Sequence, residues 1–372
     1  MGLINDPQMN WYTIKDAEKI DSPALIVYKN RVEHNIRKVL TMVKDPSQLR
    51  PHVKTNKMLE VCKLMLDSGI RKFKAASIAE AEMLGIAGAE DVILAYQPVK
   101  PKFLRLLKLI DAYPATKYSC LVDNIESARM FSALVPKTIS LFIDLNVGMN
   151  RTGIKPAKAY DLFKELQNLR GIEFKGFHAY DGHRRDYDLA DRMAHCDRDF
   201  KEAEELRLHI QSEGYGLPLL IAGGTPTFAI HSSKQNTECC PGTFIFWDKG
   251  YHDALPEQDF QYAGLVLTRV ISIPAEDKIC IDLGHKSIAS ENDLQKRVHF
   301  LDHPELKPVG QSEEHLIMEV SKDHNFKVGD ILYALPIHIC PTVALYDRAV
   351  IINDGEVCDT WKVIARDRQI NY

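Results

Sequence analysis

The stretch LRPHVKTNKMLEVCKLMLDSG, residues 49–69, has the pattern of one strand followed by one helix. Its first part, residues 49–55, predicts a strand that ends on basic side chains. Leu59, Cys62 and Leu66 then recur at helical spacing, and Gly69 suits the C-cap of a helix. The stretch therefore predicts one complete strand–helix unit.

The same unit recurs towards the C-terminus. Further strand patterns lie at 72–77, 91–96, 117–123, 139–146, 174–180, 218–224 and 239–246, with helical patterns between them. Strands that alternate with helices form right-handed crossovers around a parallel sheet. Eight such units predict an α/β protein with a (β/α)8 TIM-type barrel, ahead of an open doubly wound sheet.

The pattern changes near residue 250, beyond which strand-like stretches predominate. Asp354-Gly355 is a strong signal for a type I′ hairpin turn. We expect the early apolar stretch ALIVY, residues 24–28, to pair with these later strands. The sequence thus predicts a barrel at 29–250 and a β-rich domain built from 1–28 and 251–372.

Composition argues against several classes of protein. A net charge of −4 without a basic block argues against nucleic acid as a partner. No apolar run reaches the ~18 residues of a membrane helix. The first residues, MGLINDPQMNW, lack the basic and apolar regions of a signal peptide, and the eight cysteines form no C-x-x-C pair. We therefore expect a cytoplasmic protein that does not act at a membrane.

Residues suited to chemistry gather where the predicted barrel strands end, which is where such barrels carry their active sites. Lys54 ends the first strand, Arg151 lies in the loop GMNRTG after the fifth, and Tyr180 ends the sixth. Small residues that let backbone N–H groups approach a phosphate occur at the last two strands: Gly223, Gly224, Thr225, Gly242 and Thr243.

Each of these signals alone also fits an ordinary turn or a solvated lysine. Together, a phosphate cradle and a lysine at one barrel mouth suggest a phosphorylated aldehyde held as a Schiff base. Pyridoxal 5′-phosphate is such an aldehyde.

Several segments resemble a known family. HVKTNK and GMNRTG resemble the lysine segment and the arginine loop of the alanine-racemase-like (fold-type III) pyridoxal-phosphate enzymes. DSPALIVYKNRVEHNI, GFHAYDGH, AGGTPTF, PGTFIFWD, SEEH and PIHIC follow the order seen in the D-threonine aldolase and D-serine dehydratase family within it. The resemblance spans nearly the whole chain and implies a homodimer that acts on small D-amino acids.

The resemblance also implies roles for individual residues. Lys54 resembles the Schiff-base lysine, and Arg151 resembles the arginine near the phenolic oxygen of the cofactor. Tyr180 resembles the ring that packs on the pyridine, although a half-buried core tyrosine is the alternative. The glycines and threonines named above resemble the phosphate cradle.

His338 and Cys340, in PIHIC, stand two residues apart. In an extended chain both side chains would point to one face, where an imidazole and a thiolate suit a zinc-like ion. A buried cysteine beside a structural histidine fits the same spacing. The resemblance implies a divalent metal at this pair, and because some members carry a carboxylate at the second position, Cys340 favours zinc over manganese.

The resemblance implies a lyase that cleaves D-threonine-like β-hydroxy-D-amino acids to glycine and an aldehyde. The alternatives are a D-serine dehydratase that yields a 2-oxo acid and ammonia, an amino-acid racemase, a pyridoxal-phosphate carrier without catalysis, and a metabolite-binding module. A racemase needs a second base on the opposite face of the substrate, and Tyr262 and Tyr333 are the tyrosines that the sequence does not exclude from this role. Residues whose roles the sequence leaves open are His52, Asp181, His183, Glu313, Glu314 and His315.

Overall fold

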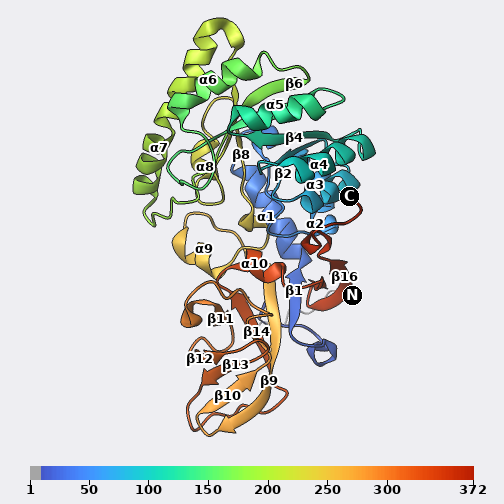
Figure 1. Cartoon of the computed structure of the whole chain (residues 1–372). Coiled ribbons are helices and arrows are strands. Elements are labelled where there is room, and N and C mark those ends of the chain that lie inside the picture. The colour runs from blue at the N-terminus through green and yellow to red at the C-terminus, as the bar shows by residue number, and fades with distance from the viewer. Residues whose placement is uncertain (1–9) are drawn as a thin grey trace, which may run out of the picture. The chain divides into compact units, whose positions relative to one another are not determined.

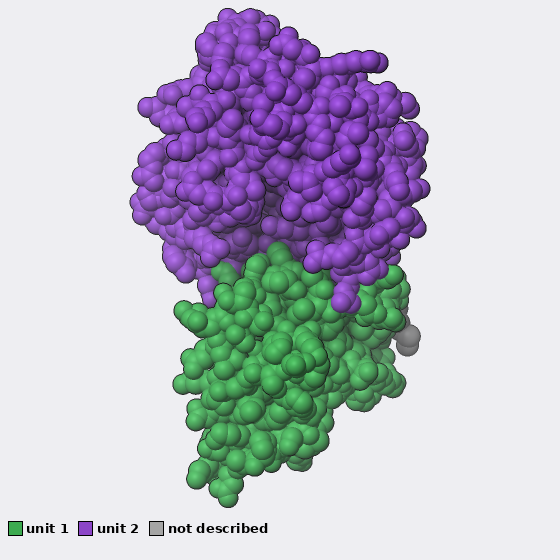
Figure 2. Space-filling model, in the orientation of Figure 1, with its two compact units in different colours: residues 1–34, 246–250, 261–363 green, residues 35–245, 251–260, 364–372 purple. Residues whose placement is uncertain are grey.

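The computed structural model describes residues 10–372, which form two compact units, coloured separately in Figure 2. In the described chain, unit 1 comprises residues 10–34, Phe246–Gly250 and Gln261–Val363, and unit 2 comprises Asn35–Ile245, Tyr251–Phe260 and Ile364–Tyr372. The expected absence of a signal peptide concerns a segment that lies almost wholly outside the described residues. No helix in the described part of the chain is long and apolar enough to cross a bilayer.

Unit 2 contains a parallel sheet of seven strands in chain order. They are β2 (Lys72–Ala75), β3 (Asp91–Leu94), β4 (Lys117–Val122), β5 (Ile139–Leu145), β6 (Ile172–Ala179), β7 (Leu219–Ala222) and β8 (Thr237–Cys239). Helices lie outside the strands (Figure 1): α2 (Leu59–Asp67), α3 (Ile78–Ala87), α4 (Lys100–Ala112), α5 (Ile125–Leu134), α6 (Pro156–Leu166) and α7 (Leu189–Ile210). Short helices α8 (Phe228–His231) and α9 (Lys249–Ala254) follow, and α1 (Lys29–Thr41) precedes the barrel.

Residues 49–53 close this sheet into a ring. Leu49 bridges to Cys239 of β8, and His52 bridges to Lys74 of β2, both in parallel register. The N–H of Lys74 donates to the carbonyl of Pro51, at 2.9 Å. The predicted first strand is therefore present as an irregular segment, since Pro51 has no N–H to extend a regular ladder. The barrel predicted from the sequence is confirmed.

The last barrel strand differs from the prediction. The strand runs over Thr237–Cys239, whereas Thr243–Ile245 forms a short 3-10 helix. Pro241 interrupts the ladder, because it offers no N–H. Gly242 and Thr243 consequently lie in the loop beyond the strand, as do the candidate residues after the other strands.

A buried ionic cluster ties the strand starts together at the opposite end of the barrel. The Arg50 guanidinium, 1% exposed, lies 2.6 Å from Glu238 of β8 and 2.7 Å from Asp91 at the start of β3. Lys72, the first residue of β2, also pairs with Glu238. The closing segment is thus held by charge as well as by backbone hydrogen bonds.

Unit 1 is built on a mostly antiparallel sheet. Its strands are β1 (Ala24–Tyr28), β9 (Gly264–Ala275), β10 (Lys278–Ile281), β11 (Val298–Phe300), β12 (Lys307–Gln311), β13 (Leu316–Glu319), β14 (Ile331–Pro336), β15 (Arg348–Asn353) and β16 (Glu356–Lys362). The expected pairing of ALIVY is confirmed, because β1 lies between β9 and β15. Asp354 and Gly355 both have positive φ at the β15–β16 turn, as a type I′ hairpin requires.

The C-terminal residues 364–372 belong to unit 2, whereas the β-rich domain expected from the sequence extends to residue 372. The amide of Asn371 donates to Glu82 of α3 at 2.8 Å, and Arg105 of α4 donates to the carbonyl of Tyr372 at 2.9 Å. These bonds hold the end of the chain against the barrel helices.

Removal of the Arg50 guanidinium should destabilise the protein, because the buried Glu238 carboxylate would keep only the partly exposed Lys72 as its partner. We expect Arg50→Ala to lower the free energy of unfolding by about 3–5 kcal/mol in urea titrations followed by circular dichroism. Arg129→Ala is the matched control, since Arg129 and Glu165 form a solvent-exposed pair whose loss costs little. Equal losses in the two variants would contradict the role of Arg50.

Candidate functional site

Three cationic side chains surround the ring of Tyr180 in unit 2. The Lys54 Nζ lies 5.8 Å from the ring centroid, the Arg151 Cζ 4.9 Å and the Lys74 Nζ 5.5 Å. Lys54 follows the closing segment, Arg151 follows β5 and Tyr180 follows β6, so the strand ends bring together the residues singled out in the sequence. Such a concentration of positive charge suits an anionic ligand.

Lys74 was not expected at this site. It lies on β2 with 4% of its surface exposed, and burial, which disfavours the ammonium form, lowers its pKa. The nearby charges of Lys54 and Arg151 act in the same direction, against Asp144. The available signal was the second lysine of the short strand KFKA, which lies between Phe73 and Ala75.

An aspartate and a histidine form a buried pair beside these cations. The Nδ1 of His178 lies 2.6 Å from Asp144, which also accepts a hydrogen bond from Gln97 at 2.7 Å. Burial raises the pKa of Asp144, but the hydrogen bonds from His178 and other donors outweigh it, and the pKa is lowered. Burial and the charge of Lys74 lower the pKa of His178. The pair is therefore a carboxylate and a neutral imidazole with its proton on Nδ1.

The second nitrogen of His178, Nε2, is buried and has no hydrogen-bond partner among the described residues. Buried polar atoms in proteins are almost always satisfied. An unsatisfied acceptor nitrogen near the charges of Lys74 and Arg151 therefore indicates that a polar molecule with a hydrogen-bond donor belongs in this part of the barrel.

The glycines after β7 and β8 permit close approach. A Cβ on Gly223, which has φ +73°, would lie 2.7 Å from the Thr227 hydroxyl, and one on Gly224 would lie 2.9 Å from the Tyr180 ring. The Thr225 hydroxyl accepts hydrogen bonds from the N–H groups of Gly242 and Thr243, both at 3.1 Å. Thr225 thus joins the two loops and keeps its own proton to donate.

His338 and Cys340 lie in unit 1 at a strand–helix junction. The extended chain considered from the sequence is not what the structure has here, because His338 is the N-cap of α10 (Ile339–Val343) and Cys340 lies in its first turn. Pro341 favours this geometry, since proline is tolerated in the first turn of a helix.

Acidic groups surround the His338 imidazole. Its Nδ1 lies 2.5 Å from Glu291, and both side chains are partly exposed. Burial disfavours the imidazolium, but the hydrogen bond and the charge of Cys340, followed by Asp248 and Glu291, raise the pKa of His338 to about 9. A histidine that bonds a carboxylate through one nitrogen leaves the other to a metal, a pattern common in metalloproteins.

A second cluster that could hold a metal lies in unit 2. One ligand atom from each of Asp181, Cys196 and His231 lies within 4.8 Å of the others, and all three residues are buried. These atoms are hydrogen-bonded to one another, and the cluster has no exposed edge for a substrate. It differs in this from His338, whose imidazole is 45% exposed.

The other residues with open roles make local contacts. His183 bonds Asp199 of α7 at 2.9 Å, and the His52 Nδ1 accepts from the N–H of Lys54 at 3.3 Å. Burial and then the charge of Lys54 lower the pKa of His52 well below its usual value. Glu313 and Glu314 pair with Lys286 on the exposed surface of unit 1.

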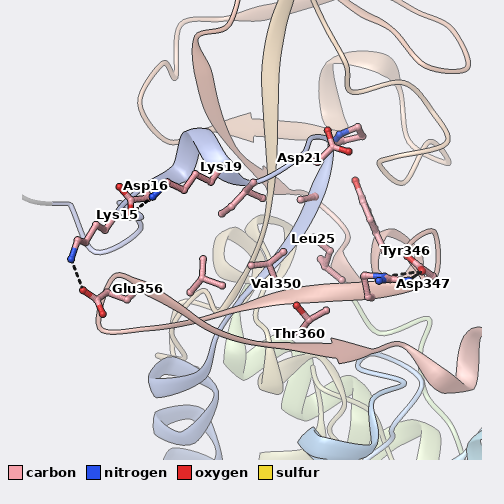
Figure 3. A pocket seen from close by; sticks show the side chains of 15 residues that line it. Lys15, Asp16, Lys19, Asp21, Leu25, Tyr346, Asp347, Val350, Glu356 and Thr360 are labelled. Atoms are coloured by element: carbon pink, nitrogen blue, oxygen red, sulfur yellow. Dashed lines mark hydrogen bonds and ion pairs between the residues drawn. The ribbon is translucent and has the colours of Figure 1, made fainter.

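A groove of about 710 Å³ on unit 1 lies apart from all of these residues (Figure 3). Its charged side chains pair with one another, Lys15 with Glu356 at 3.0 Å and Lys19 with Asp16 at 2.9 Å. None of the site residues predicted from the sequence lines it.

Comparison with known proteins identifies the family. Residues 27–249 match the model of the alanine racemase N-terminal domain, and the chain belongs to this family. Residues 263–352 match a serine dehydratase domain. The fold and the family expected from the sequence are thus confirmed.

The chain is similar to a D-threonine aldolase of Arthrobacter sp, with 27% identity over 94% of this chain and 93% of that protein. It is also 27% identical to a 3-hydroxy-D-aspartate aldolase of Paracoccus denitrificans (strain Pd 1222), over 95% of this chain and 94% of that protein. The crystal structure of D-threonine aldolase from Filomicrobium marinum superposes with a TM-score of 0.85 at 25% identity, covering 94% and 97% of the two chains.

Replacement of Lys74 by methionine should raise the pKa of His178, because the charge of Lys74 is, after burial, the main cause that lowers it. At mildly acidic pH, His178 would then carry more charge in Lys74→Met than in the wild type. The measurement is the pH dependence of imidazole signals in NMR of ¹⁵N-histidine-labelled protein, assigned with His178→Gln.

Lys72→Met, on the same strand, is the matched control and should leave this titration unchanged. Lys72 pairs with Glu238 at the other end of the barrel. An unchanged or lower pKa of His178 in Lys74→Met would show that Lys74 does not act on this imidazole.

Proposed function

We propose that the chain is a pyridoxal-phosphate-dependent, metal-assisted lyase that cleaves β-hydroxy-D-amino acids such as D-threonine to glycine and an aldehyde. The observation that carries this proposal is the ring of Lys54, Lys74 and Arg151 around Tyr180. Similarity to two aldolases over more than nine-tenths of the chain supports the choice of reaction. Pyridoxal phosphate fits the alanine-racemase-like fold.

The barrel residues suit the cofactor. Lys54 would hold its aldehyde carbon, Arg151 its phenolic oxygen and Tyr180 its ring face. Gly223, Gly224, Thr225, Gly242 and Thr243 would hold its phosphate. The three cations around Tyr180 favour an anionic guest, and the unsatisfied His178 Nε2 favours one that also carries a hydrogen-bond donor. When bound, the cofactor supplies an electron sink for a carbanion at the α-carbon of an amino acid.

The chain's own groups would manage protons and charge. Lys54, once freed from the aldehyde carbon by the substrate, is the amine that could take or return the α-proton. Asp144 holds the proton of His178 on Nδ1, so that Nε2 stays an acceptor. The low pKa of His52 keeps that imidazole neutral beside Lys54, which limits repulsion between them.

We propose His338 and Cys340 as ligands of a divalent metal, with Glu291 orienting the imidazole. A thiolate ligand favours zinc, and manganese is the second candidate. Two protein ligands leave positions open for a substrate, as a catalytic site requires. A metal there would act as a Lewis acid towards the β-hydroxyl group.

We also propose that the barrel, expected at 29–250, binds the cofactor and that the β-rich domain, expected at 1–28 and 251–372, carries the metal, although residues 251–260 and 364–372 belong to unit 2. We further propose a homodimer, on the family resemblance, and a cytoplasmic location, on the composition of the chain.

A dehydratase is the second candidate function, supported by the match of residues 263–352 to a serine dehydratase domain. The racemase alternative is weaker. Tyr333, one of the two tyrosines considered as a second base, is buried in the core of unit 1, where its hydroxyl accepts from the N–H of Ile14 at 3.3 Å. Burial also raises the pKa of Tyr333, so that less of its phenolate, the basic form, is present at neutral pH for the proton exchange that racemization needs.

The products formed from D-threonine distinguish these functions. We expect the protein, incubated with D-threonine, pyridoxal phosphate and zinc or manganese, to release glycine and acetaldehyde. Chromatographic identification of ammonia and 2-oxobutyrate instead would establish a dehydratase. If neither pair of products forms, the proposed lyase function is overturned.

Lys54→Ala tests the same assignment. We expect this variant to lose both turnover and the visible absorption of the bound cofactor. Lys63→Ala, on the exposed face of α2, is the control and should keep both. A coloured and active Lys54→Ala protein would refute the role of Lys54.

His338→Ala and Cys340→Ala should lose bound metal and activity but keep the visible absorption of the cofactor, because their side chains belong to the other unit from Lys54. Metal content is measured by mass spectrometry after gel filtration. Cys358→Ser, an exposed cysteine of the same unit, is the control and should bind metal normally. Full activity in metal-stripped wild-type protein would remove the metal from the reaction.

A further inference from the structure

A buried carboxylate next to Tyr180 accepts hydrogen bonds from three different segments. Asp181 is 1% exposed. Its Oδ1 accepts from the Thr227 hydroxyl at 2.9 Å, and its Oδ2 lies 2.9 Å from the His231 Nε2 and 3.2 Å from the Cys196 thiol. Thr227 belongs to the loop after β7, His231 to α8 and Cys196 to α7. These four residues form a buried network, which we call the Asp181 network.

The Asp181 network is arranged around a negative charge. Burial raises the pKa of Asp181, but the hydrogen bond and charge of His231, followed by the hydrogen bonds from Cys196 and Thr227, outweigh it and lower the pKa. Burial also raises the pKa of Cys196, so its sulfur remains a thiol that donates a proton. Hydrogen bonds to an ionised acceptor are stronger than neutral ones, and in a dry interior they define a single geometry.

The glycine loop after β7 packs directly on the Asp181 network. A Cβ on Gly223 would lie 2.7 Å from the Thr227 Oγ1 and 2.9 Å from the His231 Cδ2. The N–H of Gly224 donates to the Thr227 hydroxyl at 3.4 Å, and the N–H of Phe228 donates to the Gly224 carbonyl at 2.9 Å. On the other side, Gly224 faces the ring of Tyr180, the residue before Asp181. The loop therefore packs on one side against Thr227 and His231, which bond the Asp181 carboxylate, and on the other side against Tyr180, the neighbour of Asp181 in the chain.

We propose that Asp181 is a positioning residue for the phosphate of the cofactor. Through Thr227 and His231 it holds the loop 223–227 in the one conformation in which its glycines and Thr225 bind a phosphomonoester. This inference rests on the proposed function, since it takes the loop to be the phosphate site. On this inference, the buried cluster of Asp181, Cys196 and His231 serves to hydrogen-bond the loop and does not bind a metal.

The test compares pyridoxal phosphate with pyridoxal, which carries the same ring and aldehyde but lacks the phosphate. In Asp181→Asn, we expect the dissociation constant of the cofactor-free protein for pyridoxal phosphate to rise by about tenfold or more, because a charge-assisted anchor of the loop is lost. The constant for pyridoxal should change little. Visible absorption titrations measure both constants without any need for turnover.

Two matched controls separate positioning from general destabilisation. Thr227→Ser keeps the hydroxyl and should retain the preference for the phosphorylated ligand, whereas Thr227→Val should lose it as Asp181→Asn does. Arg207→Gln perturbs a buried residue of α7, the helix that also carries Cys196. The Arg207 guanidinium donates to the carbonyls of Pro218, Gln235 and Asn236, which precede β7 and β8. Arg207→Gln should lower the melting temperature without changing the ligand preference.

Equal loss of affinity for both ligands, or a lower melting temperature with unchanged preference, would overturn the inference. The inference would also be overturned if a variant with His338 and Cys340 replaced still bound a metal and lost it when Asp181→Asn was added. Wild-type protein that binds neither ligand would refute the proposed function itself, and the inference with it. Wild-type protein that binds pyridoxal phosphate no more tightly than pyridoxal would refute the inference alone.

Discussion

Residues 49–53 hydrogen-bond to β8 on one side and β2 on the other, and the parallel sheet becomes a barrel only through them. The segment is short and contains Pro51, so it cannot form a full ladder, and the buried charges of Arg50 supplement it. Lys54 follows at the opposite end of the same segment. Stability and chemistry are therefore separated along a few residues, as in barrels whose active sites lie at the strand ends.

The barrel mouth brings Lys54, Lys74 and Arg151 together. Asp144 is the carboxylate near them, and its negative charge acts to raise the pKa of Lys74. Lys74 is buried and feels the charges of Lys54 and Arg151, which is unfavourable without a counter-charge. The structure responds by lowering the pKa of Lys74 and by keeping His178 neutral. An anionic guest would remove this conflict, so the same charges that cost stability without a ligand favour its binding.

The barrel and its strand ends were predictable because strand and helix periodicity is a local property of the sequence. The predicted eighth strand was wrong beyond Cys239, where Pro241 offers no N–H for the ladder. At PIHIC a short helix begins with Pro341 in its first turn. Periodicity registers neither effect. Lys74 was missed because a single strand does not reveal that three cations will converge. Asp181 and His231 are 50 residues apart, and only the folded chain brings them into contact.

Residues of the barrel alone do not select the reaction. Any transformation that passes through charge at the α-carbon could use the same cations and the same glycine loops, and one fold supports many chemistries. Cleavage of the Cα–Cβ bond and loss of the hydroxyl differ in what happens to the β-oxygen. Groups able to act on that oxygen as a Lewis acid or base must decide between them, and the strongest such candidates in the described chain are His338 and Cys340 with Glu291. The barrel thus accounts for cofactor chemistry in general, and under the proposed function the choice of product would rest with His338 and Cys340.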